Sequence, residues 1–218
     1  KGKANITIFN VMGGSHYFTI SYSGDDNYSS FNGESEIYLD YKHSSINYAM
    51  PSNLIWGDTF AINPVLPEDA TGEIEITVYD NNGYYFNNLM SVGSIYNFTI
   101  LNGGTNYLRL YYAGDEYYGD CIYLREFNVT KLNTTLSITD KMEVDSYVPI
   151  KVTLNEDATG NIRIYMGDKW NYGVLNNGEC LFNVSGLIGA VYNVNIVYEG
   201  DSKYNSINVF KSVNITTT

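Results

Sequence analysis

Apolar and polar residues alternate with a period of two along most of the chain. Within Phe18–Tyr22 and Val194–Tyr198, every second position is apolar. In an extended strand these side chains share one face, which would be the face toward the core. We find no stretch with the spacing of an amphipathic helix. The pattern therefore predicts a chain built from β-strands.

Clusters of Gly, Asn and Asp interrupt the alternating runs, as expected for turns between short strands. Seven short strands separated by turns are typical of one β-sandwich domain. The C-terminal part of the chain contains seven such runs: Thr134–Thr139, Tyr147–Leu154, Asn161–Met166, Tyr172–Leu175, Cys180–Val184, Val191–Tyr198 and Asn208–Ile215.

Two motifs recur with one common period. The first, Tyr-x-Gly-Asp-x-x-Tyr, occurs three times, and its glycines, Gly24, Gly114 and Gly200, are 90 and 86 positions apart. The second, Glu-Asp-Ala-Thr-Gly, begins at Glu68 and again at Glu156, 88 positions later. An immunoglobulin fold has about 100 residues, whereas solenoid and propeller repeats have about 20–50. We therefore predict an all-β chain of tandem immunoglobulin-like β-sandwich domains.

The phase of the motifs predicts two complete repeats, residues 41–131 and 132–218, and a partial one, residues 1–40. The partial repeat would hold only the last three strands. Three strands with one apolar face cannot bury that face alone. Either upstream residues of a longer chain or strands donated by another subunit would have to cover it. The predicted strands are Lys3–Phe9, His16–Tyr22 and Glu34–Leu39, and the residues to be covered are Ile6, Ile8, Phe18 and Ile20.

The two cysteines, Cys121 and Cys180, are too few for a disulfide framework. Alignment of the repeats places Cys180 at an inward position of its strand. We expect it to be a buried free thiol that packs as a small apolar side chain.

The composition excludes several classes of function. The formal net charge of −12 argues against nucleic acid or an anionic membrane surface as a partner. No apolar run approaches the ~18 residues of a membrane span. His16 and His43 are the two histidines, so a zinc site or a His-dependent hydrolase lacks parts. We expect His16 to be a solvated turn residue, and we expect no enzymatic activity and no cofactor.

Seven Asn-x-Ser/Thr triplets favour an extracellular, glycosylated protein, although an Asn- and Thr-rich chain also forms such triplets by chance. The chain opens without Met or a signal-peptide pattern, which is typical of a mature piece or a window on a longer protein. The candidate glycosylation sites are Asn5, Asn27, Asn97, Asn128, Asn133, Asn183 and Asn214.

The two motifs, one near the start and one near the end of a unit of about 90 residues, resemble the bacterial-type immunoglobulin-like repeats of adhesin-like surface proteins. Gut methanogenic archaea encode many such proteins. The resemblance covers the whole chain, with residues 1–40 as a partial repeat. It implies a secreted cell-surface protein whose domains serve mostly as stalks and spacers, and it carries over no catalytic residue.

Acidic residues beside the Gly-Asp turns could supply oxygen ligands to calcium. The alternative is turn chemistry, in which Gly supplies a positive φ and the Asp side chain caps the turn. The third copy keeps the motif but loses the second carboxylate, which favours the turn interpretation. The calcium candidates are Asp25, Asp26, Asp115, Glu116 and Asp120.

Aromatic residues outside the repeat pattern could form a binding patch, because Tyr and Trp offer rigid contact area to glycans or proteins. Core packing or hairpin stacking is the alternative. The candidates are Tyr84, Tyr85, Tyr117, Trp170 and Tyr172.

Three functions compete. The first is a non-catalytic stalk or surface-fibre segment of an extracellular adhesin, with neighbouring repeats or like subunits as partners and surface glycans or proteins of another cell as ligands. The second is a self-assembling pilus-like subunit completed by strand donation. The third, a carbohydrate-binding module attached to a surface enzyme, would require an aromatic platform on one face.

Overall fold

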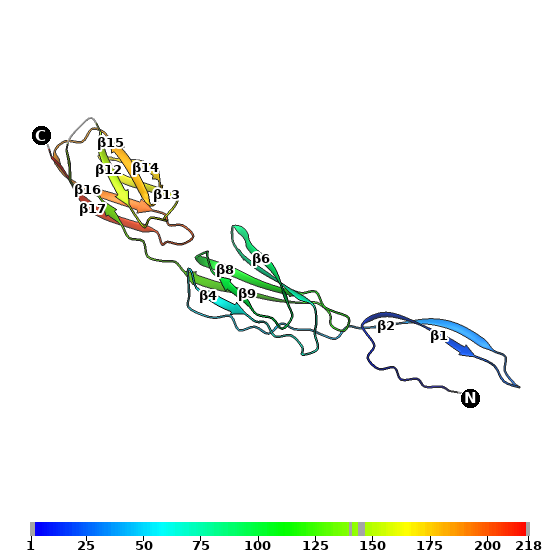
Figure 1. The fold of residues 1–218 in the computed structure, drawn as a ribbon. Helices are drawn as coiled ribbons and strands as arrows, with labels where there is room; N and C mark the ends of the chain where they lie inside the picture. Colours follow the sequence, from blue (N-terminus) through cyan, green and yellow to red (C-terminus); the bar gives the residue numbers. More distant parts are fainter. Residues whose placement is uncertain (1–2, 140, 144–146, 217–218) are drawn as a thin grey trace. The chain divides into compact units, whose positions relative to one another are not determined.

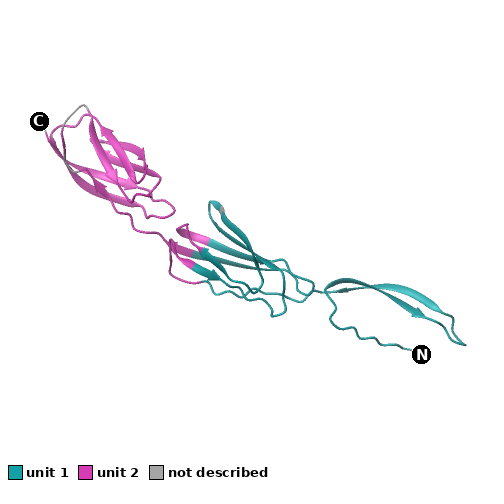
Figure 2. Ribbon diagram, viewed as in Figure 1, with its two compact units in different colours: residues 1–50, 60–98, 107–127 teal, residues 51–59, 99–106, 128–218 magenta. Residues whose placement is uncertain are grey.

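The computed structural model of the chain describes residues 3–139, 141–143 and 147–216, and within these it contains strands and no helix (Figure 1). None of the described residues therefore forms a helix that could cross a membrane. The chain divides into two compact units (Figure 2). Unit 1 comprises residues 1–50, 60–98 and 107–127, and unit 2 comprises residues 51–59, 99–106 and 128–218.

Most of unit 2 is a sandwich of two sheets. The smaller sheet has the order β10 (Ser137–Ile138), β12 (Val148–Thr153), β15 (Glu179–Val184). The larger sheet has the order β11 (Lys141–Glu143), β17 (Ile207–Thr216), β16 (Ala190–Tyr198), β13 (Asn161–Met166), β14 (Lys169–Val174).

Alternation along the strands produces the core of this sandwich. Val148, Ile150 and Val152 of β12 are buried and face the buried residues of β13 and β16. Cys180 is buried among them and free, as the alignment predicts. Burial raises the pKa of its thiol.

Two details of the strand prediction for this sandwich are wrong. The first run, predicted as Thr134–Thr139, pairs only at Ser137–Ile138, and β11 follows as a separate strand that pairs in parallel with β17 in the other sheet. Strand β14 begins at Lys169, not at Tyr172. Gly167 (φ 63°) and Asp168 (φ 60°) form the tight turn of the β13–β14 hairpin, so pairing starts directly after them.

A second pair of sheets belongs mostly to unit 1. The larger sheet has the order β3 (Leu54–Ile55), β9 (Cys121–Thr130), β8 (Gly104–Tyr112), β5 (Glu73–Asp80), β6 (Gly83–Ser91), and β4 (Thr59–Ile62) pairs with β7 (Tyr96–Thr99). Leu108 and Leu110 of β8 are fully buried. Phe98 packs against Phe60 and Phe86 with ring centroids 5.7 and 4.9 Å apart. The prediction of an all-β chain of tandem β-sandwiches is confirmed, while the exact repeat boundaries stay a prediction.

Residues 3–40 form a single antiparallel hairpin of β1 (Gly14–Tyr22) and β2 (Phe31–Leu39). The predicted strand Lys3–Phe9 is wrong, because no strand forms there. Its counterpart β7 pairs with β4, and residues 3–40 contain no counterpart of β4 for it to pair with. Strand β2 also begins earlier than the predicted Glu34.

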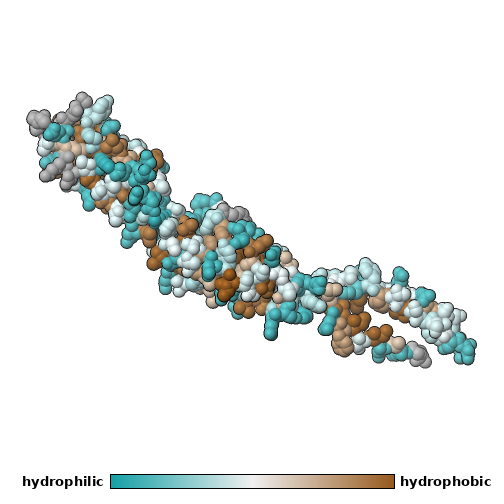
Figure 3. Space-filling view, in the orientation of Figure 1, coloured by the Kyte–Doolittle hydropathy of each residue, from teal (hydrophilic) through white to brown (hydrophobic). Residues whose placement is uncertain are grey.

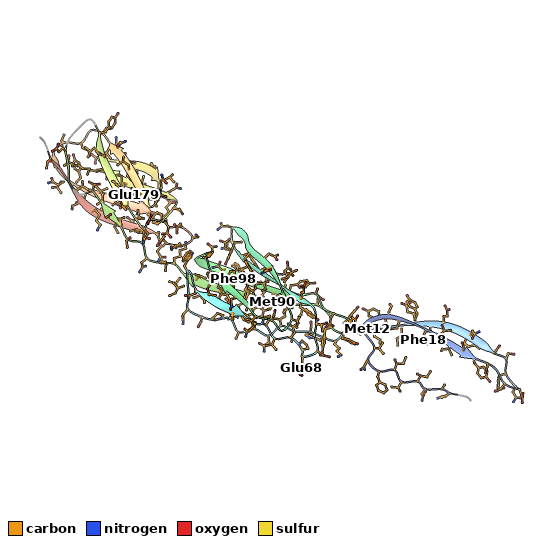
Figure 4. The ribbon with its side chains drawn as sticks, in the orientation of Figure 1. Met12, Phe18, Glu68, Met90, Phe98 and Glu179 are labelled. Atoms are coloured by element: carbon orange, nitrogen blue, oxygen red, sulfur yellow. The ribbon has the colours of Figure 1, made fainter. Side chains whose placement is uncertain are left out.

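The hairpin leaves its apolar residues at the surface. Phe18 is 42% and Ile20 is 52% exposed, and Ile6 and Ile8 in the segment before the hairpin are exposed as well. Hydrophobic side chains accordingly appear at the surface of this region in Figure 3, and Phe18 is labelled in Figure 4. The expectation that residues 1–40 cannot bury their own apolar side chains agrees with this arrangement.

Candidate functional site

The Gly-Asp motifs fold into tight turns that the aspartate itself closes. In unit 2, Oδ1 of Asp201 accepts the N–H groups of Lys203 (2.8 Å) and Tyr204 (2.7 Å). The N–H of Asp201 donates in turn to the Tyr204 carbonyl at 3.2 Å. Gly200, at φ 81°, supplies the left-handed conformation that begins the turn. The turn interpretation of this motif is confirmed.

The second carboxylate oxygen of the same aspartate reaches the other motif. Oδ2 of Asp201 accepts the backbone N–H (3.0 Å) and the hydroxyl (3.2 Å) of Thr159. In unit 1, Oδ2 of Asp115 accepts the same two groups of Thr71 at 2.8 and 3.1 Å. We call this arrangement the Asp–Thr corner: the Asp of a Tyr-x-Gly-Asp-x-x-Tyr turn bonded to the Thr of an Asp-Ala-Thr-Gly loop.

Tyrosines of the motif strengthen each corner. The hydroxyl of Tyr204 donates to Asp157 at 2.7 Å, and that of Tyr118 donates to Asp69. The hydroxyl of Tyr198 donates to the carbonyl of Thr159 at 2.9 Å. Each corner thus joins two loops through side-chain as well as backbone groups.

A lysine neutralises the loop aspartate in both corners but comes from different places in the sequence. Nζ of Lys42, in the connection before the second repeat, lies 3.3 Å from Asp69. In the last repeat the cation is Lys203, which belongs to the turn itself and pairs with Asp157. The charge balance of the corner is therefore preserved without the position of the lysine being preserved.

The corner sets the ionisation of its groups. Burial raises the pKa of Asp115, but the N–H groups of Thr71, Tyr117 and Tyr118 lower it by more, and the net shift is well below the usual range. Asp201 is shifted in the same direction for the same reasons. Burial, with the nearby Asp115 carboxylate, raises the pKa of Tyr112 to about 12.

The calcium candidates do not gather into a site. No group of three or more His, Cys, Asp or Glu side chains that could hold a metal ion occurs within residues 3–139, 141–143 and 147–216. Asp25 and Asp115 direct both carboxylate oxygens at hydrogen-bond donors. Asp26, Glu116 and Asp120 are exposed. The carboxylates of Asp25 and Asp115 are thus used in hydrogen bonds that hold the turns.

Two of the binding-patch candidates lie on the outer face of the β13–β14 hairpin. Trp170 packs against Tyr165 with ring centroids 5.4 Å apart, and the Arg163 guanidinium lies 5.3 Å from the Trp170 ring centre. Tyr172, opposite Arg163, is 73% exposed. A hollow of about 460 Å³ beside the Tyr172 ring is lined by Arg163, Tyr172, Val174 and Val197.

Tyr85 and Tyr117 do not join this aromatic face. Tyr85 lies on β6, and burial raises the pKa of its hydroxyl. Tyr117 lies at the corner of unit 1, 5.5 Å from Nζ of Lys42. The side chain of Tyr84 lies outside the described ones. The four candidates whose side chains are described therefore divide among three places.

On the corresponding face of the preceding repeat, polar side chains occupy the places of Arg163 and Trp170. There Glu75 accepts hydrogen bonds from Asn87 (3.0 Å) and Arg109 (2.8 Å). Aromatic side chains gather on neighbouring strands of the same face, where Tyr79 stacks on Tyr107 with ring centroids 5.1 Å apart and the Arg109 guanidinium lies 4.9 Å from the Tyr111 ring centre. Both repeats therefore carry aromatic rings on this face, but at different positions.

Sequence reasoning overlooked a pair of glycines that contact the next Gly-Asp turn. In unit 1, the N–H of Gly13 donates to the Glu116 carbonyl at 2.9 Å. In unit 2, the N–H of Gly103 donates to the Ser202 carbonyl at 2.7 Å. A Cβ on Gly103 would lie 2.4 Å from Cγ of Lys131 and 2.9 Å from the Ser202 oxygen, so only glycine fits. A Gly-Gly pair repeated at a distance of 90 positions was the available signal.

His16 is a structural residue and not a turn residue. It lies within β1, and its Nε2 is 2.8 Å from the carbonyl oxygen of Met12. Asn106 and Tyr192 occupy the matching positions, and each donates to the carbonyl four residues earlier, at 3.1 and 3.3 Å. Three different side chains thus satisfy the same backbone oxygen in the three copies.

All seven glycosylation candidates are exposed: Asn5, Asn27, Asn97, Asn128, Asn133, Asn183 and Asn214. Their occupancy stays a prediction.

No protein-family model matches the chain, and no curated protein sequence matches it. Solved structures match at low identity. A two-domain fibronectin type-III segment of chicken tenascin is 13% identical with a TM-score of 0.39, and the match covers 78% of this chain and 97% of that one. Fibronectin(III)-like modules of Clostridium thermocellum CbhA are 9% identical with a TM-score of 0.31, covering 80% and 94%.

The D1–D4 ectodomain fragment of ICAM-5 is 10% identical with a TM-score of 0.32, covering 94% of this chain and 62% of that one. At such identities and TM-scores these neighbours carry no argument about this chain. The tandem β-sandwich architecture rests on the sheets described above, and the function has to be argued from the residues of this chain.

We predict that the Asp–Thr corners make the fold sensitive to acid. Because the pKa values of Asp115 and Asp201 are lowered by folding, their contribution is present above about pH 4, the unfolded pKa, and is lost as the pH falls through the folded values. Urea unfolding between pH 6 and pH 2.5 measures this. The Asp115→Asn/Asp201→Asn variant should lose about 1 to 3 kcal/mol per site at pH 6 and show a flatter acid limb. Glu116→Gln, at an exposed neighbour, is the control, and equal acid limbs in all three proteins would contradict the account.

Proposed function

We propose that this chain is a non-catalytic stalk segment of an adhesin-like protein at the extracellular cell surface. In this role the tandem sandwiches hold a distal part of the protein away from the cell, and no chemistry is required of them. A stalk works only if its repeats resist bending, so the connections between repeats are the relevant feature.

Lys42 and Leu132, each at the start of a predicted repeat, connect that repeat to the one before it and are held by backbone hydrogen bonds within the repeat that they begin. Lys42 donates to the Tyr117 carbonyl at 2.7 Å and accepts from Gly119 at 3.0 Å. Leu132 donates to the Lys203 carbonyl at 2.8 Å and accepts from Asn205 at 2.9 Å. Each connection is therefore part of a β-bridge beside a Gly-Asp turn, unlike a flexible linker. This recurrence is the observation that carries the proposal.

The glycines described above contact the same turns. Gly13 and Gly103 each donate to the carbonyl of the residue that follows the turn aspartate. The preceding loop and the connection therefore both bond to one turn, which opposes bending about either of them. Exposed sequons and a net charge of −12 suit an extracellular surface, because glycans and like charges keep neighbouring molecules apart.

A pilus-like subunit completed by strand donation is the alternative. The exposed apolar residues of the β1–β2 hairpin favour it, since a donated strand would cover them. The two functions differ in solution: a filament subunit polymerises on its own, whereas a stalk segment stays monomeric.

The aromatic face of the last repeat supports a second role in attachment. Aromatic rings stack on the apolar faces of sugar rings, and flanking polar side chains fix orientation. The rings of Trp170 and Tyr172, with the guanidinium of Arg163, provide such a surface beside the hollow. A surface glycan of another cell is the ligand that this chemistry favours.

Backbone ¹⁵N relaxation tests the stalk. We predict that amides of residues 60–98 and 147–216 report one correlation time, that of a rigid 24.5 kDa particle. In Gly103→Ala the added Cβ collides with its neighbours. The amides of residues 60–98 and those of residues 147–216 should then report two separate and shorter correlation times.

Gly119→Ala is the matched control, because a Cβ there makes only ordinary contacts at 3.7 Å or more. Separate correlation times in the unaltered protein would remove the stalk proposal, and a particle size that grows with concentration would favour the filament subunit.

Glycan binding has its own measurement. Isothermal titration with soluble hexose oligosaccharides should detect binding that falls at least about tenfold in Trp170→Ala and in Tyr172→Ala, as expected when a stacking ring is removed. Tyr147→Ala, which removes an exposed aromatic ring before β12, should leave binding unchanged. If no oligosaccharide binds, or if the ring variants bind as well as the unaltered protein, this role is excluded.

A further inference from the structure

The first copy of the Gly-Asp motif forms its turn but lacks its corner. Oδ1 of Asp25 accepts the N–H groups of Asn27 (2.8 Å) and Tyr28 (2.9 Å), as in the other copies. No Asp-Ala-Thr-Gly loop precedes it in residues 1–40. Tyr28 is 71% exposed, whereas its counterparts Tyr118 and Tyr204 are 8% and 5% exposed.

Oδ2 of Asp25, which has no threonine to bond to, accepts a hydrogen bond from a different donor. In both complete corners Oδ2 receives the Thr N–H and hydroxyl, and in unit 2 the hydroxyl of Tyr198 also donates to the Thr159 carbonyl. In the first copy the hydroxyl of Tyr22 has neither that Thr nor its carbonyl. It donates instead to Oδ2 of Asp25 at 2.6 Å, and Tyr22 is 41% exposed where Tyr198 is fully buried.

The complete repeats specify the strand that would pair with β1. In unit 1, Ile74 and Ile76 of β5 pair with Tyr112 and Leu110, the counterparts of Tyr22 and Ile20. In unit 2 the same pairing recurs on β13, where Ile162 lies opposite Tyr198. In both repeats the first of these isoleucines comes three residues after the corner Thr.

We propose that residues 3–40 are a docking surface for one occupant: a segment with the pattern Asp-Ala-Thr-Gly-x-Ile-x-Ile, the first half of an immunoglobulin-like repeat. Its Thr bonds to Oδ2 of Asp25, its Asp accepts the hydroxyl of Tyr28, and its two isoleucines cover the face of Ile20 and Tyr22. Tyr22 then turns from Asp25 to the Thr carbonyl. This inference concerns recognition and does not rest on the stalk or the filament function.

A second copy of this chain fits less well as the occupant. Its two Asp-Ala-Thr-Gly loops already bond to Asp115 and Asp201, so donating either would break a complete corner. A segment whose Asp-Ala-Thr-Gly loop has no aspartate partner of its own can dock without breaking such a corner.

The test extends the full chain at its N-terminus with a copy of its own residues 42–92, which carries the required pattern. Amide hydrogen exchange by NMR should show protection of the β1 amides rising at least about tenfold. The same extension with Asp69→Ala and Thr71→Val in the copied segment should lose most of that gain. Asp25→Asn should reduce the protection of the β1 amides by a larger factor in the extended chain, where the carboxylate also accepts the added Thr, than in the original chain, where it accepts only its own turn and Tyr22.

The Asp25→Asn variant leaves the added segment intact, so it decides the matter even if the altered copy fails to fold. Equal protection with and without the extension overturns the proposal, as does an Asp25→Asn effect of the same size in both chains. Protection of β1 in the original chain that rises with concentration, together with a dimer in sedimentation, also overturns it and assigns the face to a second copy.

Discussion

Each complete repeat depends on one aspartate carboxylate that accepts four hydrogen bonds. Two hold its own turn closed, and two come from a threonine more than 40 residues away in the sequence: Thr71 for Asp115 and Thr159 for Asp201. A carboxylate among these donors is stable only in its ionised form, and the donors are satisfied only if it is present. The two loops therefore have to form together. Since each loop starts or ends a strand of the same sheet, the corner also fixes the register of β5 against β8 and of β13 against β16.

The rest of the structure builds on these turns. The connection residues Lys42 and Leu132 bridge to the turn of the repeat that they begin, and Gly13 and Gly103 reach the same turn. Asp69 and Asp157, the aspartates of the Asp-Ala-Thr-Gly loops, add further bonds to these turns, because each contacts a tyrosine hydroxyl and a lysine. In residues 3–40 the turn exists without its threonine, and there the strands remain a hairpin with an exposed apolar face. Residues 3–40 therefore differ from a complete sandwich in lacking both the Asp-Ala-Thr-Gly loop and the strands that flank it.

Much of this fold could be predicted from the sequence, because alternation and motif spacing report local geometry directly. The inward position of Cys180 and the turns at the Gly-Asp motifs follow from a period of two and from glycine's access to positive φ. The strand predicted at Lys3–Phe9 failed because a strand needs a partner, and propensity does not say whether one is present. The meeting of Thr71 with Asp115 depends on which strands pair, which no local pattern encodes. Gly13 and Gly103 were overlooked because the sequence indicates a close approach of two backbones only through the glycine that permits it.

The candidate binding face was likewise predictable only in part from the sequence. Trp170 and Tyr172 could be selected by residue type, but Arg163 and Tyr165 join them only through the pairing of β13 with β14. The most direct measurement of the central claim is amide hydrogen exchange at Thr71 and Thr159, which lie in exposed loops outside the strands. If the corners hold the repeats together, these two amides exchange as slowly as core strand amides such as Ile164, and far more slowly than Glu156 in the same loop. Exchange as fast as that of Glu156 would contradict the account.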